Sequence, residues 1–104
     1  MRDDPGSIFN EPALFLQALA NGRRLHVLTL LNQAEWDVTS LAAAVGLSQS
    51  AASQHLAKLQ AACLVTIRHE AQTIWYRCNS KAVNDILMLL ASSFHVPANV
   101  AEAA

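Results

Sequence analysis

The segment from Leu47 to Leu59, LSQSAASQHLAKL, carries short hydrogen-bonding side chains and one full charge, on Lys58. An ideal helix turns by about 100° per residue, which places Ala52, Leu56, Leu59 and Cys63 on one narrow apolar stripe. The opposite side of such a helix is small and polar. Amide and hydroxyl groups that can approach a partner closely are suited to hydrogen bonding with base edges in the major groove of DNA.

The candidates for base contact lie in the first turns of this expected helix: Gln49, Ser50, Ser53 and Gln54. The N-terminal residues of a recognition helix normally reach base edges, and glutamine can form two hydrogen bonds with adenine. Lys58 is expected to bind a phosphate, a contact that fixes register and carries no sequence information. His55 lies at the border of the apolar stripe, where a packing role is favoured. The alternative for the whole face is a solvated surface on an alanine-rich helix.

A hairpin is expected directly after this helix. LVTIRH and TIWYRC are rich in β-branched and aromatic residues, and EAQ separates them. We place Arg68 and His69 at the tip, followed by Gln72. An arginine on such a wing can reach backbone phosphates or a minor groove. The alternative is an ordinary solvated turn.

The remaining segments predict helices before and after this unit. Apolar spacing indicates helices in PALFLQALA, RRLHVLTLLN, SLAAAV and SKAVNDILMLLASSF. Asp37 or Thr39 can cap the third helix and Gly46 can end it, while Ser48 or Ser50 can cap the fourth, which runs to about Ala62. The order of four helices, a hairpin and a last helix predicts an α+β, mainly α, winged helix-turn-helix. We expect a flexible arm at 1–9, the domain at 10–95 and a flexible tail at 96–104.

Composition predicts an oligomer. Hydrophobic residues make up 53% and charged residues 14% of 104 residues, and a domain this small buries so much apolar surface with difficulty. The net charge of −1 gives no overall sign of a nucleic-acid partner, although it can hide a local basic face. There is no apolar run long enough to span a membrane, and the start, MRDDPGSIF, is unlike a signal peptide. We expect a cytoplasmic protein with reduced cysteines.

Taken together, these segments resemble one bacterial family. LSQSAASQHLAKLQAACLV is similar to the recognition segment of the arsenic-repressor (ArsR) regulators, and EAQTIWY resembles their wing. LANGRRLHVLTLL resembles their second helix, which usually has proline at the position of Gly22. The similarity covers about residues 13–94 and is closest to the nodulation-repressor and biofilm-repressor branch. It implies a homodimer joined through the first and last helices, which binds an inverted repeat in double-stranded DNA and represses transcription.

The sequence departs from the sensing relatives at their ligand positions. Asp37, Val38 and Thr39 stand where one metal-sensing group has Cys-Val-Cys, and Ser80, Ala82 and Ser93 stand near the metal ligands of another. Zinc-like ions need cysteine or histidine ligands. Thr29 and His95 replace the cysteine pair of the persulfide sensors. We therefore expect no metal site and no cofactor, and the sequence leaves any inducer open.

Two cysteines remain, Cys63 and Cys78. If Ala71 and Gln72 form the turn, Cys78 lies opposite Val65 and Cys63 is its diagonal neighbour. Such neighbours are roughly 7–8 Å apart, and a disulfide needs Cα atoms within about 7 Å, so a redox-responsive repressor is one alternative. The interpretation that we favour is two buried cysteines acting as small apolar residues.

Two classes of function are compatible with this fold. The first is a sequence-specific DNA-binding regulator, and the second is a protein-interaction module that keeps the winged fold without binding DNA. The polar outward residues of the fourth helix favour DNA, because an interaction module would present apolar anchors there. An enzyme is not expected, since no paired carboxylates, activated nucleophile or phosphate-binding loop occurs in the sequence.

Overall fold

A computed structural model describes residues 5–96 of the chain. Its elements are η1 (Pro5–Phe9, a 3-10 helix), α1 (Asn10–Leu19), α2 (Gly22–Gln33), α3 (Val38–Val45), α4 (Gln49–Ala61), β1 (Thr66–Glu70), β2 (Thr73–Arg77) and α5 (Lys81–Phe94). This order confirms the predicted winged helix-turn-helix. Residues 1–4 and 97–104, which include part of the expected arm and nearly all of the expected tail, lie outside the described residues, and the proposed domain limits stay a prediction.

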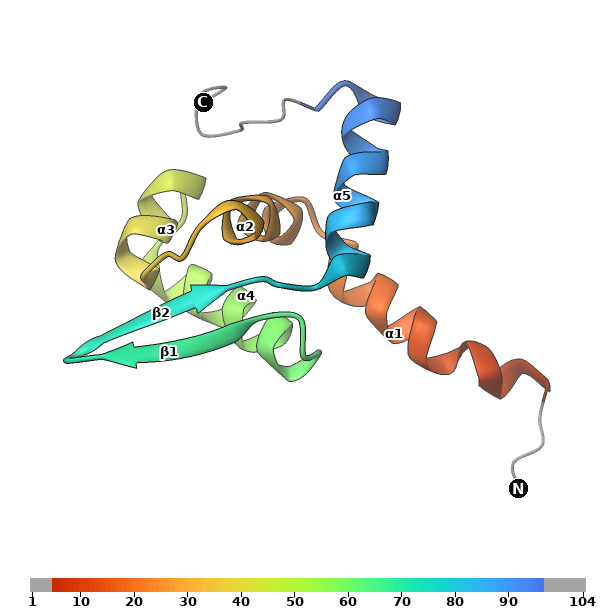
Figure 1. Ribbon diagram of the computed structural model, residues 1–104, viewed down its shortest axis with the longest axis horizontal. Helices are drawn as coiled ribbons and strands as arrows, with labels where there is room; N and C mark the ends of the chain where they lie inside the picture. Colours follow the sequence, from red (N-terminus) through yellow and green to blue (C-terminus); the bar gives the residue numbers. More distant parts are fainter. Residues whose placement is uncertain (1–4, 97–104) are drawn as a thin grey trace.

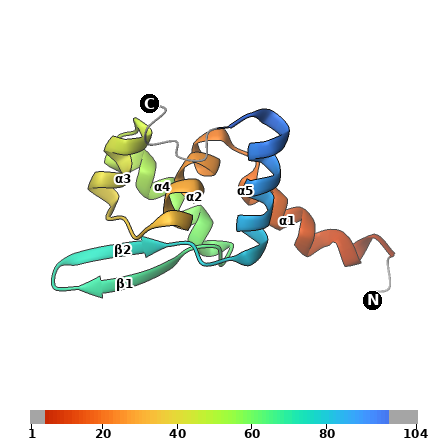
Figure 2. The same cartoon turned by 45° about the horizontal axis from the view of Figure 1, so that its top comes forward.

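The core is built around α2. Val27, Leu28, Leu30 and Leu31 of this helix are almost completely buried. They pack against apolar side chains of α3, α4 and α5 in one cluster. Figures 1 and 2 show α2 in the middle of the molecule, with the hairpin and α1 projecting from opposite sides. The α2 core is therefore the common support of the recognition helix and the wing.

The ends of α3 and the start of α4 are fixed by two capping hydrogen bonds and one left-handed glycine. The Ser40 N–H donates to the Asp37 carboxylate at 3.2 Å, which caps α3. Gly46 ends α3 with a φ of +71°, a conformation that glycine adopts without steric strain. The Ala51 N–H donates to the Ser48 hydroxyl at 3.1 Å, which caps α4. Of the alternatives that the sequence left open, Asp37 and Ser48 are therefore the caps.

Replacing the α4 cap should loosen the start of the recognition helix. We expect Ser48→Ala to lower the free energy of unfolding by about 1 kcal/mol, because one helical N–H loses its partner. Urea unfolding followed by circular dichroism measures the change. Ser50→Ala is the control, since Ser50 lies inside α4 and makes no capping bond. Equal stability of the Ser48 variant and the wild type would contradict the assignment of the cap.

The end of α4 corrects one expectation. The helix stops at Ala61, and Cys63 adopts a left-handed conformation with a φ of +62°. The Leu64 N–H donates to the Leu59 carbonyl at 3.0 Å across this turn, a hydrogen-bond pattern common at helix ends. Because the chain turns away before Cys63, this residue is exposed and does not extend the apolar stripe, as the sequence had suggested.

The hairpin has the expected turn and register. Ala71 and Gln72 connect the strands, and Arg68 pairs with Trp75. Arg68 and His69 therefore lie within β1, so their predicted placement at the tip was wrong. The reason is that pairing continues up to Glu70, which leaves a two-residue turn.

Candidate nucleic-acid interface

The outward surface of α4 agrees with the division predicted from helical spacing. Ala52, Leu56 and Leu59 are at most 2% exposed. All five predicted contact residues on the helix are exposed: Gln49, Ser50, Ser53, Gln54 and Lys58. Within residues 5–96 these five side chains make no hydrogen bond or ion pair with another group of the protein. Their donors and acceptors are thus free for a ligand.

A local concentration of positive charge lies beside this surface. The pKa of His55 is lowered first by desolvation and then by the charges of Arg24, Lys58 and Arg23. The neutral imidazole is therefore favoured at neutral pH, and three cations gather around it in a chain whose net charge is −1. His55 is half-buried, which fits the predicted packing role better than contact with a base.

The two arginines of this group are held by backbone carbonyls. Arg23 donates from Nη1 to the Val45 carbonyl at 2.7 Å. Arg24 donates from Nε to the Ala18 carbonyl at 2.7 Å and from Nη2 to the Gln17 carbonyl at 3.3 Å. These bonds tie the start of α2 to the ends of α3 and α1. They leave Lys58 as the cation of the group that is free to move toward a ligand.

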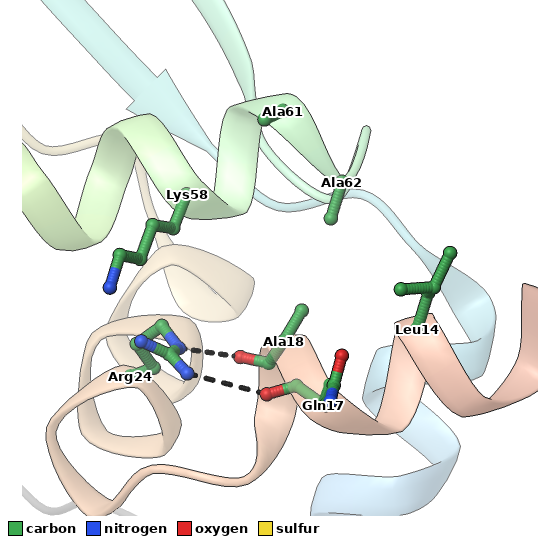
Figure 3. Close-up of a pocket in the computed structure, with 7 residues that line it drawn as sticks. All are labelled: Leu14, Gln17, Ala18, Arg24, Lys58, Ala61 and Ala62. Carbon is green, nitrogen blue, oxygen red and sulfur yellow. Dashed lines mark hydrogen bonds between the residues drawn. The ribbon is translucent and has the colours of Figure 1, made fainter.

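A shallow groove of about 440 Å³ separates α1 from the C-terminal end of α4. Figure 3 shows the Lys58 amine and the Arg24 guanidinium near one end of this groove, with Leu14 and Ala62 at the other. The lining residues are Leu14, Gln17, Ala18, Arg24, Lys58, Ala61 and Ala62, and none of them is acidic. The flank of α4 is therefore positive, as binding to a polyanion requires.

The wing holds its arginine in an ion pair that sequence reasoning missed. Arg68 donates from Nε and Nη2 to the two carboxylate oxygens of Glu35, each at 2.9 Å. Its guanidinium also lies 5.9 Å from the centre of the Trp75 ring. Hydrogen bonding to Arg68 lowers the pKa of Glu35, and the same contact raises the pKa of Arg68. Gln72, by contrast, is exposed at the turn.

The structure thus places five of the seven predicted residues on α4 and two on the hairpin. The five are exposed on α4, and Gln72 lies at the tip of the hairpin. Arg68 lies in mid-strand and is already paired. The hairpin is positioned by β2, which packs on α2 and α3. Wing and recognition helix are therefore held in a fixed relation through the helices that they share.

A second surface is apolar and uncovered. Large exposed side chains occur on η1, α1 and the segment from α5 to its end: Ile8, Phe9, Leu14, Leu16, Met88, Leu89, Phe94 and Val96. Contiguous apolar surface on a small domain usually marks an interface. Most of these side chains lie on or beside the first and last helices, through which the family resemblance implies dimerisation.

The two cysteines differ in their surroundings. Cys63 is exposed and Cys78 is buried, and both are free thiols. Burial raises the pKa of Cys78, which keeps its thiol protonated and poorly reactive. The expectation of two buried cysteines is confirmed for Cys78 and wrong for Cys63.

Within residues 5–96, no three histidine, cysteine or acidic side chains lie close enough together to hold a metal ion. In the same part of the chain, no helix combines the length and the apolar character needed to cross a membrane.

Comparison with known proteins gives consistent matches. Residues 21–66 match the family described as "Bacterial regulatory protein, arsR family". The nodulation protein NolR of Rhizobium meliloti is 51% identical over 80 residues, which are 77% of this chain and 66% of that protein. The transcriptional activator HlyU of Vibrio cholerae is 46% identical over 74% of this chain and 71% of its own length.

Solved structures extend the similarity to the whole fold. The crystal structure of NolR from Sinorhizobium fredii superposes with a TM-score of 0.85 at 42% identity, covering 93% of this chain and 99% of that one. A homodimeric winged helix-turn-helix DNA-binding domain from Mycobacterium bovis superposes with a TM-score of 0.76 at 31% identity, covering 95% and 94%. Both likenesses include the helices on either side of the recognition unit.

Proposed function

We propose that this chain, which belongs to the arsR family of bacterial regulatory proteins, is a homodimeric transcriptional repressor. It binds an inverted-repeat operator in double-stranded DNA. The observation that carries the proposal is the outward face of α4, where exposed amides and hydroxyls without internal partners stand over a buried apolar stripe. A helix that faced only water on this side would carry more charge than the single lysine of this segment, Lys58.

In this mechanism α4 enters the major groove, which is about 12 Å wide and admits one helix. Gln49, Ser50, Ser53 and Gln54 meet base edges, while Ala57 keeps the helix surface low. Lys58 binds a phosphate on the flank. Gln72 at the tip of the wing lies within reach of the DNA backbone. A second subunit repeats these contacts one helical turn away, roughly 34–36 Å along the duplex.

Repression follows if the operator overlaps a promoter, because the bound dimer then excludes RNA polymerase. HlyU is named a transcriptional activator, whereas a relative from Agrobacterium fabrum is named a biofilm growth-associated repressor, so relatives regulate in more than one direction. We assign repression here on the resemblance to the nodulation and biofilm branch. The protein acts at the bacterial chromosome, hence in the cytoplasm, and carries no enzymatic activity in this proposal.

Two substitutions on α4 separate base reading from phosphate binding. Gln54→Ala should weaken binding to the operator by about 1–3 kcal/mol per subunit, or roughly 5- to 150-fold, and should relax the preference at one base pair of each half-site. Lys58→Ala should weaken binding to all sequences alike and reduce the salt slope by about 1 per subunit. Fluorescence anisotropy with operator and scrambled duplexes measures both.

The two variants serve as controls for each other, because both residues are exposed on the same helix. If Gln54→Ala lowered affinity for operator and scrambled DNA equally, the assigned reading face would be wrong. If the wild-type protein bound no duplex in a salt-dependent manner, the interaction-module function would replace the proposed one.

A further inference from the structure

The Arg68–Glu35 pair has the geometry that a guanidinium uses to bind a phosphate. Two parallel N–H groups of Arg68 each contact one Glu35 oxygen at 2.9 Å. Arginine binds carboxylate and phosphate oxygens through the same planar fork. Glu35 therefore takes the place on Arg68 that a DNA phosphate would take.

Glu35 reaches this position because the connector between α2 and α3 pairs with the wing. Trp36 donates to the Tyr76 carbonyl at 3.0 Å and accepts from the Tyr76 N–H at 2.9 Å. Side chains alternate between the two faces of extended backbone, and Trp36 and Tyr76 pack against the core. Their neighbours Glu35 and Trp75 thus lie on the opposite face, which they share with Arg68.

The charges on this face balance. Arg68 meets Glu35 and, at 3.5 Å, Glu70. Arg77 lies close enough to Glu35 to lower the pKa of its carboxyl. Two acids and two cations leave the described part of this face without net charge, so it attracts a polyanion weakly. Removal of Glu35 would make it positive.

We propose that Glu35 is a built-in phosphate mimic, which holds Arg68 in the free protein and is exchanged for a DNA backbone phosphate when the operator binds. The inference rests on the proposed function. Arg68 and Glu35 retain 48% and 35% of their side-chain exposure, and ion pairs this exposed contribute little to stability. A phosphate brought close by the docking of α4 can therefore displace the carboxylate. On DNA where α4 finds no matching bases, the pair stays closed and non-specific affinity stays low.

The test is a double-mutant cycle on DNA binding, in which Glu35→Gln is made alone and together with Arg68→Gln. Dissociation constants are measured for operator and scrambled duplexes over a range of salt concentrations. Glu35→Gln should tighten binding by up to about fivefold per protomer, as expected for release from an exposed ion pair. On scrambled DNA the slope of log K against log salt should become steeper by about 0.9 per protomer, as for one additional phosphate contact, whereas the operator slope should change less, because that contact already forms there in the wild type. The gain should be larger on scrambled DNA than on the operator.

The double variant decides between exchange and simple repulsion. In the Arg68→Gln background, Glu35→Gln should produce no gain in affinity or slope. An equal gain in both backgrounds would mean that Glu35 only repels DNA, and unchanged or weaker binding by Glu35→Gln would mean that the pair only positions the wing. Either result overturns the exchange while leaving the proposed function intact. A wild-type protein that bound no duplex would overturn both. Tryptophan fluorescence of each variant verifies that the hairpin stays packed.

Discussion

Leu89→Glu should convert the protein to a monomer and abolish operator binding at concentrations where the wild type is saturated. Leu89 is 61% exposed in the single chain, on the apolar side of α5. Burial of a leucine is worth roughly 1.5–3 kcal/mol, and a two-fold symmetric interface places every substitution in both subunits. We therefore expect the dimer to weaken by roughly 100-fold or more. Sedimentation velocity measures the oligomeric state.

Ala43→Glu is the control for this substitution. Ala43 is exposed on α3, so the variant gains the same charge away from α1 and α5 and should remain a dimer. Circular dichroism should show full helix content for both variants, because neither position is buried in the single chain. If the Leu89 variant sedimented as a dimer, the interface would lie elsewhere than on the exposed apolar surface of the first and last helices.

Leu59→Ala should be the most destabilising single substitution within the recognition helix. The Leu59 side chain is completely buried against the core. Truncation of a buried leucine to alanine lowers the free energy of unfolding by about 2–5 kcal/mol, a large part of the roughly 5–15 kcal/mol that stabilises a typical domain. Chemical denaturation at fixed protein concentration measures the loss, since the stability of a dimer depends on concentration.

Gln60→Ala provides the comparison in the same helix. Gln60 is exposed, and exposed substitutions of this kind change stability by about 0.5 kcal/mol or less. A loss for Leu59→Ala as small as that for Gln60→Ala would contradict the apolar stripe on which the orientation of α4 depends.

The features predictable from the sequence are those set by local spacing. The apolar stripe of α4, the caps at Asp37 and Ser48, and Gly46 at the end of α3 depend on residues within one or two turns of each other. Helical periodicity and capping chemistry identify such features directly. The hairpin turn at Ala71 and Gln72 is predictable for the same reason. The overall excess of apolar residues predicted an oligomer, and the family resemblance implied that the first and last helices join the subunits.

The features that sequence reasoning missed depend on distant contacts or on one residue at a helix end. Glu35 and Arg68 are 33 positions apart, and their pairing requires that the connector at Trp36 run alongside β2. No local pattern predicts that pairing. The helix α4 ends at Ala61, two residues before Cys63. Helix ends are uncertain by one or two residues when read from sequence, and here that difference moves the Cys63 side chain from the expected core stripe to solvent.

If a dimer reads DNA through the outward face of α4, selection from a random duplex pool should recover its operator. Purified protein is incubated with the pool at moderate salt, and bound sequences are amplified over several rounds. We expect enrichment of an inverted repeat whose half-sites are centred roughly 10–10.5 base pairs apart. Gln54→Ala should lose the preference at the same position in each half-site. If the pool stayed random after repeated selection, the protein would not be a sequence-specific DNA-binding protein. If Gln54→Ala selected the same motif as the wild type, the outward face of α4 would not read the bases as assigned.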